Sequence, residues 1–165
     1  MPPIRLEQIW IAPTAKAPPC SVAAAEIEAH CGIVGDRYHT GIGSFSRFAT
    51  RGRPITLISY EALIRIHKHL ALDLLSAGLH RRNLVISGCN AEDFGELMSR
   101  TFRIGGVVFS GQGTAHPCRF LEKVAPPGSF DALRHCGGMR ADVSEGGRIQ
   151  CGDIVQPEGP LRTLP

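Results

Sequence analysis

Hydrophobic and polar residues alternate along much of the chain, which is the pattern of strands with one buried face. Residues 4–12 (IRLEQIWIA) show this alternation. Apolar runs bounded by glycine, proline or polar residues predict further strands within 54–59, 83–87, 101–113 and 139–155. The segment 21–30 is compatible with a helix or a strand, and the prolines before it and Gly32 after it favour a strand. Residues 32–43 read as a glycine-framed loop.

One longer helix is predicted at residues 60–77. Ser59 is a suitable N-cap, Gly78 can end the helix, and apolar residues recur along one face at Leu63, Ile66, Leu70 and Leu74. Shorter helices are predicted near 118–124 and 129–135. Strands outnumber helices, so we expect a mainly β fold, a β-barrel with a few peripheral α-helices.

The length of 165 residues fits a single domain, which we place at 1–157, followed by a loose Pro-rich tail at 158–165. The first residues do not form a signal peptide, and no run approaches the ~20 apolar residues that cross a bilayer. Six cysteines without paired spacing indicate reduced thiols rather than a disulfide framework. We therefore expect a cytoplasmic protein that does not contact a membrane.

The net charge of +3 is small, and no basic run contains interleaved aromatic residues, so nucleic acid is not an expected partner. Most of the basic residues are arginines, whose rigid guanidinium can bind a phosphate or carboxylate through two hydrogen bonds. Two of them, Arg81 and Arg82, come with Asn83 immediately before a predicted buried strand. Arg37 lies in the glycine-framed loop. These residues are candidate anion ligands.

The segment GQGTAHPCRFLE places Cys118 at a turn, behind Pro117 and before a predicted short helix. Flanked by His116 and Arg119, its sulfur is suited to act as a soft metal ligand, a nucleophile or a sulfur carrier. For Cys20, Cys31, Cys89 and Cys151 we favour the ordinary role of a small buried apolar residue. A zinc site that would use Cys118 is not favoured, because the neighbouring histidines and cysteines lack a recognised ligand spacing.

In order along the chain, these segments resemble the MOSC family, named for the C-terminal domain of molybdenum-cofactor sulfurases. The matching segments are GIVGDR, RRNLVISG, AEDFGELM, FRIGGVVF, HPC and EGGRIQCGDIV. Each is short, but their ordered occurrence from Ile4 to Val155 is fairly specific. The resemblance implies a β-barrel with a pocket for the pterin cofactor of molybdenum, molybdopterin.

The resemblance also implies roles for individual residues. Cys118 would bind the metal, and His116 takes the place of a serine that lines the site in amidoxime-reducing members. Arg81 and Asn83 would contact the pterin and its phosphate, with Arg37 as a further phosphate ligand. Arg140 stands where those members carry a tyrosine, which would make this pocket more cationic, and with His116 it is counted among the expected cofactor-binding residues.

The chain departs from the family pattern at two further places. Tyr38 stands where small members often have a histidine, before His39, and Lys16-Ala17 only partly matches a lysine–serine pair of the amidoxime reducers.

Three functions use such a pocket. The first is a molybdenum-dependent oxidoreductase that reduces N-hydroxylated compounds with electrons from a flavin reductase, ferredoxin or cytochrome, because the chain has no cysteine cluster for iron–sulfur ligation. The second is a sulfur carrier, in which Cys118 receives a persulfide from a cysteine desulfurase. The third is a cofactor-binding or transfer protein without turnover.

Overall fold

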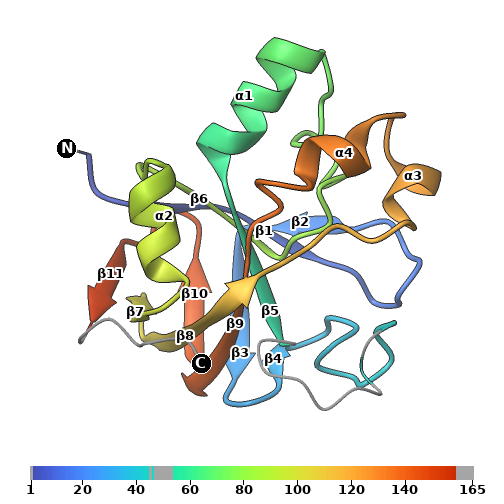
Figure 1. Cartoon of the computed structure of the whole chain (residues 1–165). Helices are drawn as coiled ribbons and strands as arrows, with labels where there is room; N and C mark the ends of the chain where they lie inside the picture. The colour runs from blue at the N-terminus through green and yellow to red at the C-terminus, as the bar shows by residue number, and fades with distance from the viewer. Residues whose placement is uncertain (1, 45, 47–53, 159–165) are drawn as a thin grey trace.

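The structure, a computed structural model, describes residues 2–44, 46 and 54–158. Strands dominate these residues (Figure 1): β1 Arg5–Ile11, β2 Cys20–Val22, β3 Ala24–Glu28, β4 Gly32–Ile33, β5 Ile55–Ser59, β6 Leu84–Ser87, β7 Thr101–Ile104, β8 Val107–Thr114, β9 Met139–Glu145, β10 Gly147–Gln150 and β11 Val155–Glu158. The helices are α1 Tyr60–Leu70, α2 Ala91–Leu97, α3 Leu121–Val124 and α4 Ser129–Leu133. The expectation of a mainly β fold with few helices is confirmed.

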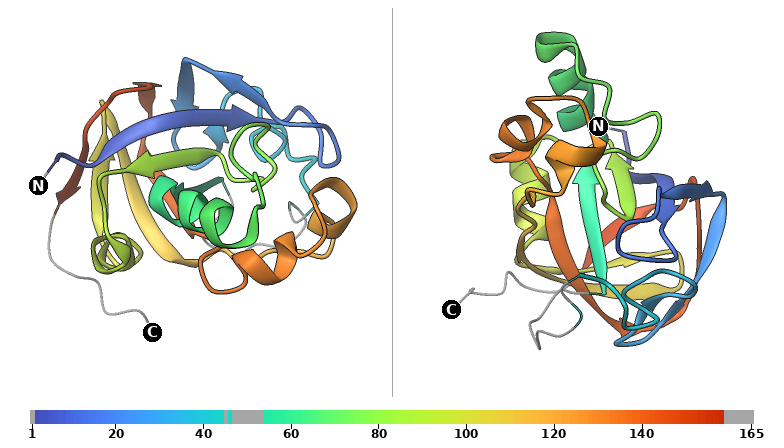
Figure 2. Two further views of the ribbon diagram at one scale, coloured as in Figure 1. Left: turned by 90° about the horizontal axis from the view of Figure 1, so that it is seen from above. Right: turned by 90° about the vertical axis from the view of Figure 1, so that its right-hand side faces the viewer.

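Eight strands form one mixed sheet in the order β11-β7-β8-β9-β5-β6-β1-β2, and a second sheet has the order β10-β3-β4. Neighbouring strands are antiparallel except β5 and β6, which are parallel because α1 carries the chain back between them. The sheets curve around a common interior, and α1, α3 and α4 gather at one end of the molecule (Figures 1 and 2). That end, where β5 and β8 run into helices and loops, holds the candidate site.

The predicted barrel does not close among the described strands. The large sheet ends at β11 on one side and at β2 on the other. The start of β11 approaches the start of β1, beyond the part that β2 covers, through an isolated bridge between Arg5 and Ile154 and a few backbone hydrogen bonds, such as Val155 N–H to Ile4 O at 2.8 Å. The described strands therefore form a large, strongly curved mixed sheet with a smaller sheet beside it, and a closed barrel is not confirmed.

The interior consists of the apolar positions that alternate along the strands. Phe102 of β7 and Phe109 of β8 are fully buried and stack with ring centroids 5.4 Å apart. A second apolar cluster lies beneath α1, α3 and α4 and includes Trp10, Ile58 and Leu63. Burial of these side chains fixes the strand register, because a slip by one residue would turn each apolar side chain toward water.

The long helix ends earlier than its apolar periodicity predicts. Ser59 caps α1 as expected, with its hydroxyl accepting the Ala62 N–H, but the last helical residue is Leu70. Ala71 then adopts a left-handed backbone with φ of 54°, and the Asp73 carboxylate accepts N–H bonds that organise the next turn. Leu74 is buried all the same, from a loop rather than from the helix face.

Two further local predictions differ from the structure. The segment 21–30 is extended, but it is divided between β2 and β3, which belong to different sheets. Helix α2 was not predicted. Its signal is the capping box at Asn90 and Asp93, in which each side chain accepts the backbone N–H of the other residue.

Of the predicted tail, Glu158 belongs to β11 and pairs with Thr101, while residues 159–165 lie outside the described part of the chain. None of the helices within the described ranges is long and apolar enough to span a membrane.

Candidate functional site

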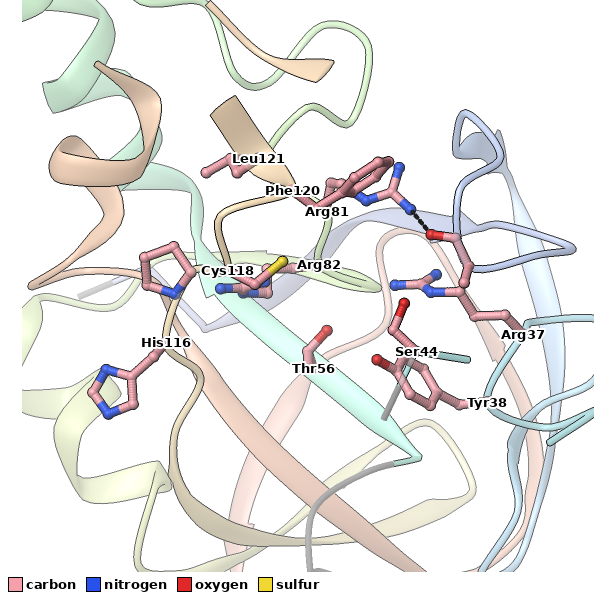
Figure 3. Close-up of a pocket in the computed structure, with 12 residues that line it drawn as sticks. Arg37, Tyr38, Ser44, Thr56, Arg81, Arg82, His116, Cys118, Phe120 and Leu121 are labelled. Carbon is pink, nitrogen blue, oxygen red and sulfur yellow. Dashed lines mark hydrogen bonds between the residues drawn. The ribbon is translucent and has the colours of Figure 1, made fainter. Parts of the chain in front are cut away.

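A pocket lies at the end of the molecule where the 32–44 loop, β5 and the segment after β8 come together (Figure 3). Its lining combines three arginines, one thiol and several small or aromatic side chains: Ala15, Arg37, Tyr38, Ser44, Thr56, Arg81, Arg82, His116, Pro117, Cys118, Phe120 and Leu121. The enclosed volume is about 100 Å³. Sites that enclose a whole drug-sized molecule measure roughly 300–1,000 Å³, so a larger ligand would extend through the open side.

The glycine-framed loop is fastened to the end of β1 through Asp36, which is fully buried. One carboxylate oxygen accepts the Ala12 N–H at 3.0 Å and a guanidinium N–H of Arg37 at 3.1 Å, and the other accepts the Tyr38 N–H at 3.2 Å. The Arg37 guanidinium lies 4.9 Å from the centre of the Tyr38 ring. Asp36 therefore positions Arg37 on one wall of the pocket and offsets part of its charge.

Arg81 reaches the pocket through an unusual backbone. Its φ of 57° lies in the left-handed region that non-glycine residues rarely adopt. The side chain donates to the carbonyl oxygens of Ala15 and Ala17, each at 3.0 Å, and its guanidinium lies 5.3 Å from the centre of the Phe120 ring. Arg81 therefore joins the loop after β1 to the segment before α3 and places a cation between them.

Arg82 supports the loop that carries the thiol. Its Nε donates to the Gly137 carbonyl oxygen, and its Nη2 donates to the Ala115 carbonyl oxygen at 3.0 Å. Nη1 donates to none of the residues that the structure describes. Figure 3 shows the Arg82 guanidinium beside Cys118. Arg82 thus fixes the backbone next to His116 and places a positive charge near the Cys118 sulfur.

Cys118 and His116 are both exposed, on an irregular segment between β8 and α3. Within β8, Gly111 lets the end of α2 pack close to the strand, because a Cβ atom there would lie 2.3 Å from the Leu97 carbonyl oxygen. Gly113, with a φ of 103°, lies at the register shift between Gly111 and Thr114, just before the segment begins. Pro117 precedes the thiol and lines the same pocket. The sulfur therefore faces the pocket from a loop held by the sheet and by Arg82.

The pocket holds more positive than negative charge. Burial lowers the pKa of Arg81, and the charge of Arg37 lowers it further. Burial lowers the pKa of Arg82 to about 10, with Cys118 and Tyr38 acting in the opposite direction. No carboxylate lines the pocket among the described residues, and backbone carbonyls are weak substitutes for a counter-ion. This wall is suited to an anion.

The predicted site residues do not all lie together. Arg37, Arg81, His116 and Cys118 line one pocket. Asn83 is buried behind it: its amide oxygen accepts the N–H and hydroxyl of Thr56, and its amide nitrogen donates to the Trp10 carbonyl oxygen.

Two other basic residues named from the sequence lie beside this pocket rather than in its lining. Arg140 lies on β9, paired in register with Thr56 of β5. Lys16 lines a separate, mostly apolar cavity of about 530 Å³ that also touches Arg81.

Several lining residues were not identified from the sequence. Ser44 and Phe120 come from loops and carry no motif of their own, and Tyr38 was noted only as a departure from the family pattern. Thr56 could have been inferred as the residue between two buried apolar positions of β5. Across the described chain, no group of three or more His, Cys, Asp or Glu residues could hold a metal ion. A protein-bound metal here would need ligands from a cofactor as well.

All six cysteines are free. Of the four expected to be buried apolar residues, Cys89 is buried and Cys31 is intermediate, but Cys20 and Cys151 are exposed on or beside edge strands. Burial raises the pKa of the Cys89 thiol to about 12 and also raises that of Cys136. Cys118 is therefore distinguished by its place in the arginine-lined pocket rather than by exposure alone.

Comparison with known proteins identifies the same segments. The model of the MOSC domain matches residues 35–156. The fold is similar to the YuaD protein of Bacillus subtilis (TM-score 0.74, 19% identity, covering 92% of this chain and 93% of that chain). It is also similar to YiiM of Escherichia coli (TM-score 0.65, 15% identity, 98% and 71%) and YiiM of Geobacillus stearothermophilus (TM-score 0.68, 13% identity, 95% and 76%). No curated protein matches the chain at a significant level.

Proposed function

This chain belongs to the MOSC domain family, and we propose that it binds the pterin cofactor of molybdenum and reduces N-hydroxylated compounds. The observation that carries the proposal is a cysteine thiol that faces a pocket lined by three arginines and by no carboxylate among the described residues. A soft thiolate is a suitable ligand for molybdenum, and guanidinium groups are suitable ligands for the phosphate of the pterin.

The charge of the pocket fits that phosphate. Arg37, Arg81 and Arg82 supply three positive charges, and the Asp36 carboxylate removes one, which leaves two. A phosphate monoester carries about −1.5 to −2 charges at pH 7. Binding such a group would offset the cost of holding Arg81 and Arg82 away from water without a carboxylate partner, a cost that shows in their lowered pKa values.

In this proposal each residue has a separate role. Cys118 holds the metal, the arginines hold the phosphate, and Arg82 keeps the Cys118 loop in place through the Ala115 and Gly137 carbonyls. When bound, the cofactor would supply the two electrons needed to cleave the N–O bond, whose oxygen leaves as water. His116, exposed at the pocket margin, can carry one of the protons that leave with that oxygen as water.

The electrons come from outside the chain. We propose a reductase partner, a flavin reductase, a ferredoxin or a cytochrome, because the cysteines are dispersed over the described structure and do not form a cluster that could hold iron and sulfur.

A sulfur carrier is the second candidate, and the exposure of Cys118 favours it. A persulfide carrier must present its sulfur to a cysteine desulfurase and then to an acceptor, and the Cys118 thiol is open to solvent. A protein that binds or transfers the cofactor without turnover would use the same pocket. The reductase should contain molybdenum and turn substrate over, and the sulfur carrier should carry a persulfide on Cys118. The binding or transfer protein should contain the cofactor without catalysing a reaction.

A turnover assay tests the first function. The protein is purified from a host that makes the cofactor, supplied with a chemical electron donor, and given benzamidoxime. Cys118→Ala should abolish formation of benzamidine, whereas Cys20→Ala and Cys89→Ala, which change thiols outside the pocket, should retain it. Full turnover by Cys118→Ala would exclude the proposed role of this sulfur.

A further inference from the structure

Arg140 stands beside the pocket on a strand that supplies none of its lining residues among those described. It lies on β9 opposite Thr56 of β5, and paired residues of antiparallel strands place their side chains on the same face of the sheet. Thr56 lines the pocket below Cys118 and Arg82 (Figure 3). The Nη2 atom of Arg140 lies 4.0 Å from the point where a side chain at Gly113 would begin. The guanidinium therefore lies on the pocket face, near the loop that leads to His116.

The guanidinium of Arg140 has no partner in the described structure. It donates no hydrogen bond and forms no ion pair within the described residues, and its Nε is buried with its hydrogen-bonding capacity unused. The other arginines near the pocket each have at least one partner within the protein: Arg37 pairs with Asp36, and Arg81 and Arg82 donate to backbone carbonyls with some of their N–H groups. A partly buried cation with unused donors is costly unless a ligand satisfies it.

The charge balance leaves Arg140 available for a second anion. The summed charge of Arg37, Arg81, Arg82 and Asp36 already matches the charge of one phosphate. Arg140 approaches from β9, whereas those arginines come from the 32–44 loop and from the residues before β6. A negative group bound by Arg140 would therefore be one other than that phosphate.

We propose that Arg140 binds a carboxylate of the substrate, so that the site selects negatively charged N-hydroxylated compounds over neutral ones. The proposal rests on the proposed reductase function. The planar guanidinium matches a carboxylate through two parallel hydrogen bonds, which gives orientation as well as attraction. The bound carboxylate would hold the far end of the substrate beside Thr56 and Gly113 while its N–O group lies toward Cys118.

The test compares two substrates that differ only in charge, benzamidoxime and 4-carboxybenzamidoxime. Wild-type protein should favour the carboxylated compound in kcat/KM. Arg140→Gln should lower kcat/KM for that compound about tenfold or more, the loss typical of a hydrogen bond to a charged group, and change the neutral one about twofold or less. Arg148→Gln is the matched control and should leave the preference unchanged, because it removes an exposed arginine of β10 outside the pocket and leaves β9 intact.

Equilibrium binding and metal content separate this inference from the proposed function. Calorimetric titration of the oxidised, non-reacting protein should show the same preference for the carboxylate in wild type and its loss in Arg140→Gln. If neither compound is reduced but this preference is found, the reaction is wrong and the anion site stands. Loss of molybdenum in Arg140→Gln would make Arg140 a cofactor ligand and overturn the inference, as would equal preference in wild type and variant. If Arg140→Gln does not fold, Arg140→Lys, which keeps the charge but not the planar fork, should show a smaller loss of preference.

Discussion

His80 should make the stability of this protein fall in mild acid. The imidazole is fully buried, with its Nδ1 accepting the Arg82 N–H at 3.0 Å and its ring edge-on to Trp10 at 6.2 Å between centroids. The proton of the neutral ring is then on Nε2, which is buried without a partner in the described structure. Burial, with a further contribution from Arg82, lowers the pKa of His80 from 6.5 to about 3.

The size of the effect follows from the two pKa values. At pH 4.5 the unfolded chain carries a protonated His80 and the folded chain a neutral one, so the unfolded state binds about one proton more. Stability is therefore lost as the pH falls below 6.5. Two pH units at about 1.36 kcal/mol each give a loss of about 2.7 kcal/mol between pH 7.5 and 4.5 from this residue.

Urea denaturation at pH 7.5 and 4.5 measures this loss against a variant that cannot titrate. His80→Gln keeps an acceptor for the Arg82 N–H and should lose about 2.7 kcal/mol less than wild type over the same interval. His69→Gln, at an exposed position of α1, should behave as wild type. If His80→Gln and wild type lose equal stability, His80 is not buried in its neutral form.

Two further predictions concern folding. Gly138→Ala should destabilise by about 3 kcal/mol or more, because its Cβ would lie 2.0 Å from the Leu57 carbonyl oxygen at a φ of 98°. Gly152→Ala has a similar φ but open space and should cost about 1 kcal/mol by urea denaturation, so equal costs would refute the steric argument. Asn83→Ala removes one buried and two partly buried hydrogen bonds between strands and should cost about 3 kcal/mol, against about 1 for the exposed N-cap variant Asn90→Ala. Equal losses in these two variants would show that Asn83 does not join the strands.

The strands were predictable because their apolar alternation reports burial directly. The end of α1 was not, because Leu74 continues the helical spacing yet is buried from a loop, and periodicity alone does not distinguish the two. Closure of a barrel depends on which distant edges pair, and the local pattern of β2 and β11 does not contain that information.

For the site, the sequence indicated Cys118 and the arginines because their side-chain chemistry is specific. It did not indicate that the Asn83 amide forms hydrogen bonds with residues of two strands. Nor did it indicate that the Arg82 guanidinium holds the Cys118 loop through a hydrogen bond to a backbone carbonyl oxygen. Those roles depend on contacts between residues far apart in the chain, and neighbouring residues do not encode them.

Molybdenum content gives the most direct test of the central claim, that Cys118 is the protein ligand in an arginine-lined cofactor pocket. The wild type and Cys118→Ser are purified from a host that makes the cofactor, and metal per chain is measured together with urea unfolding and intact mass. We predict molybdenum in the wild type, its loss or an inactive form in Cys118→Ser, and little change in unfolding, because Cys118 is exposed. Full molybdenum and full activity in Cys118→Ser, or a metal-free wild type with an added sulfur on Cys118, would contradict the account.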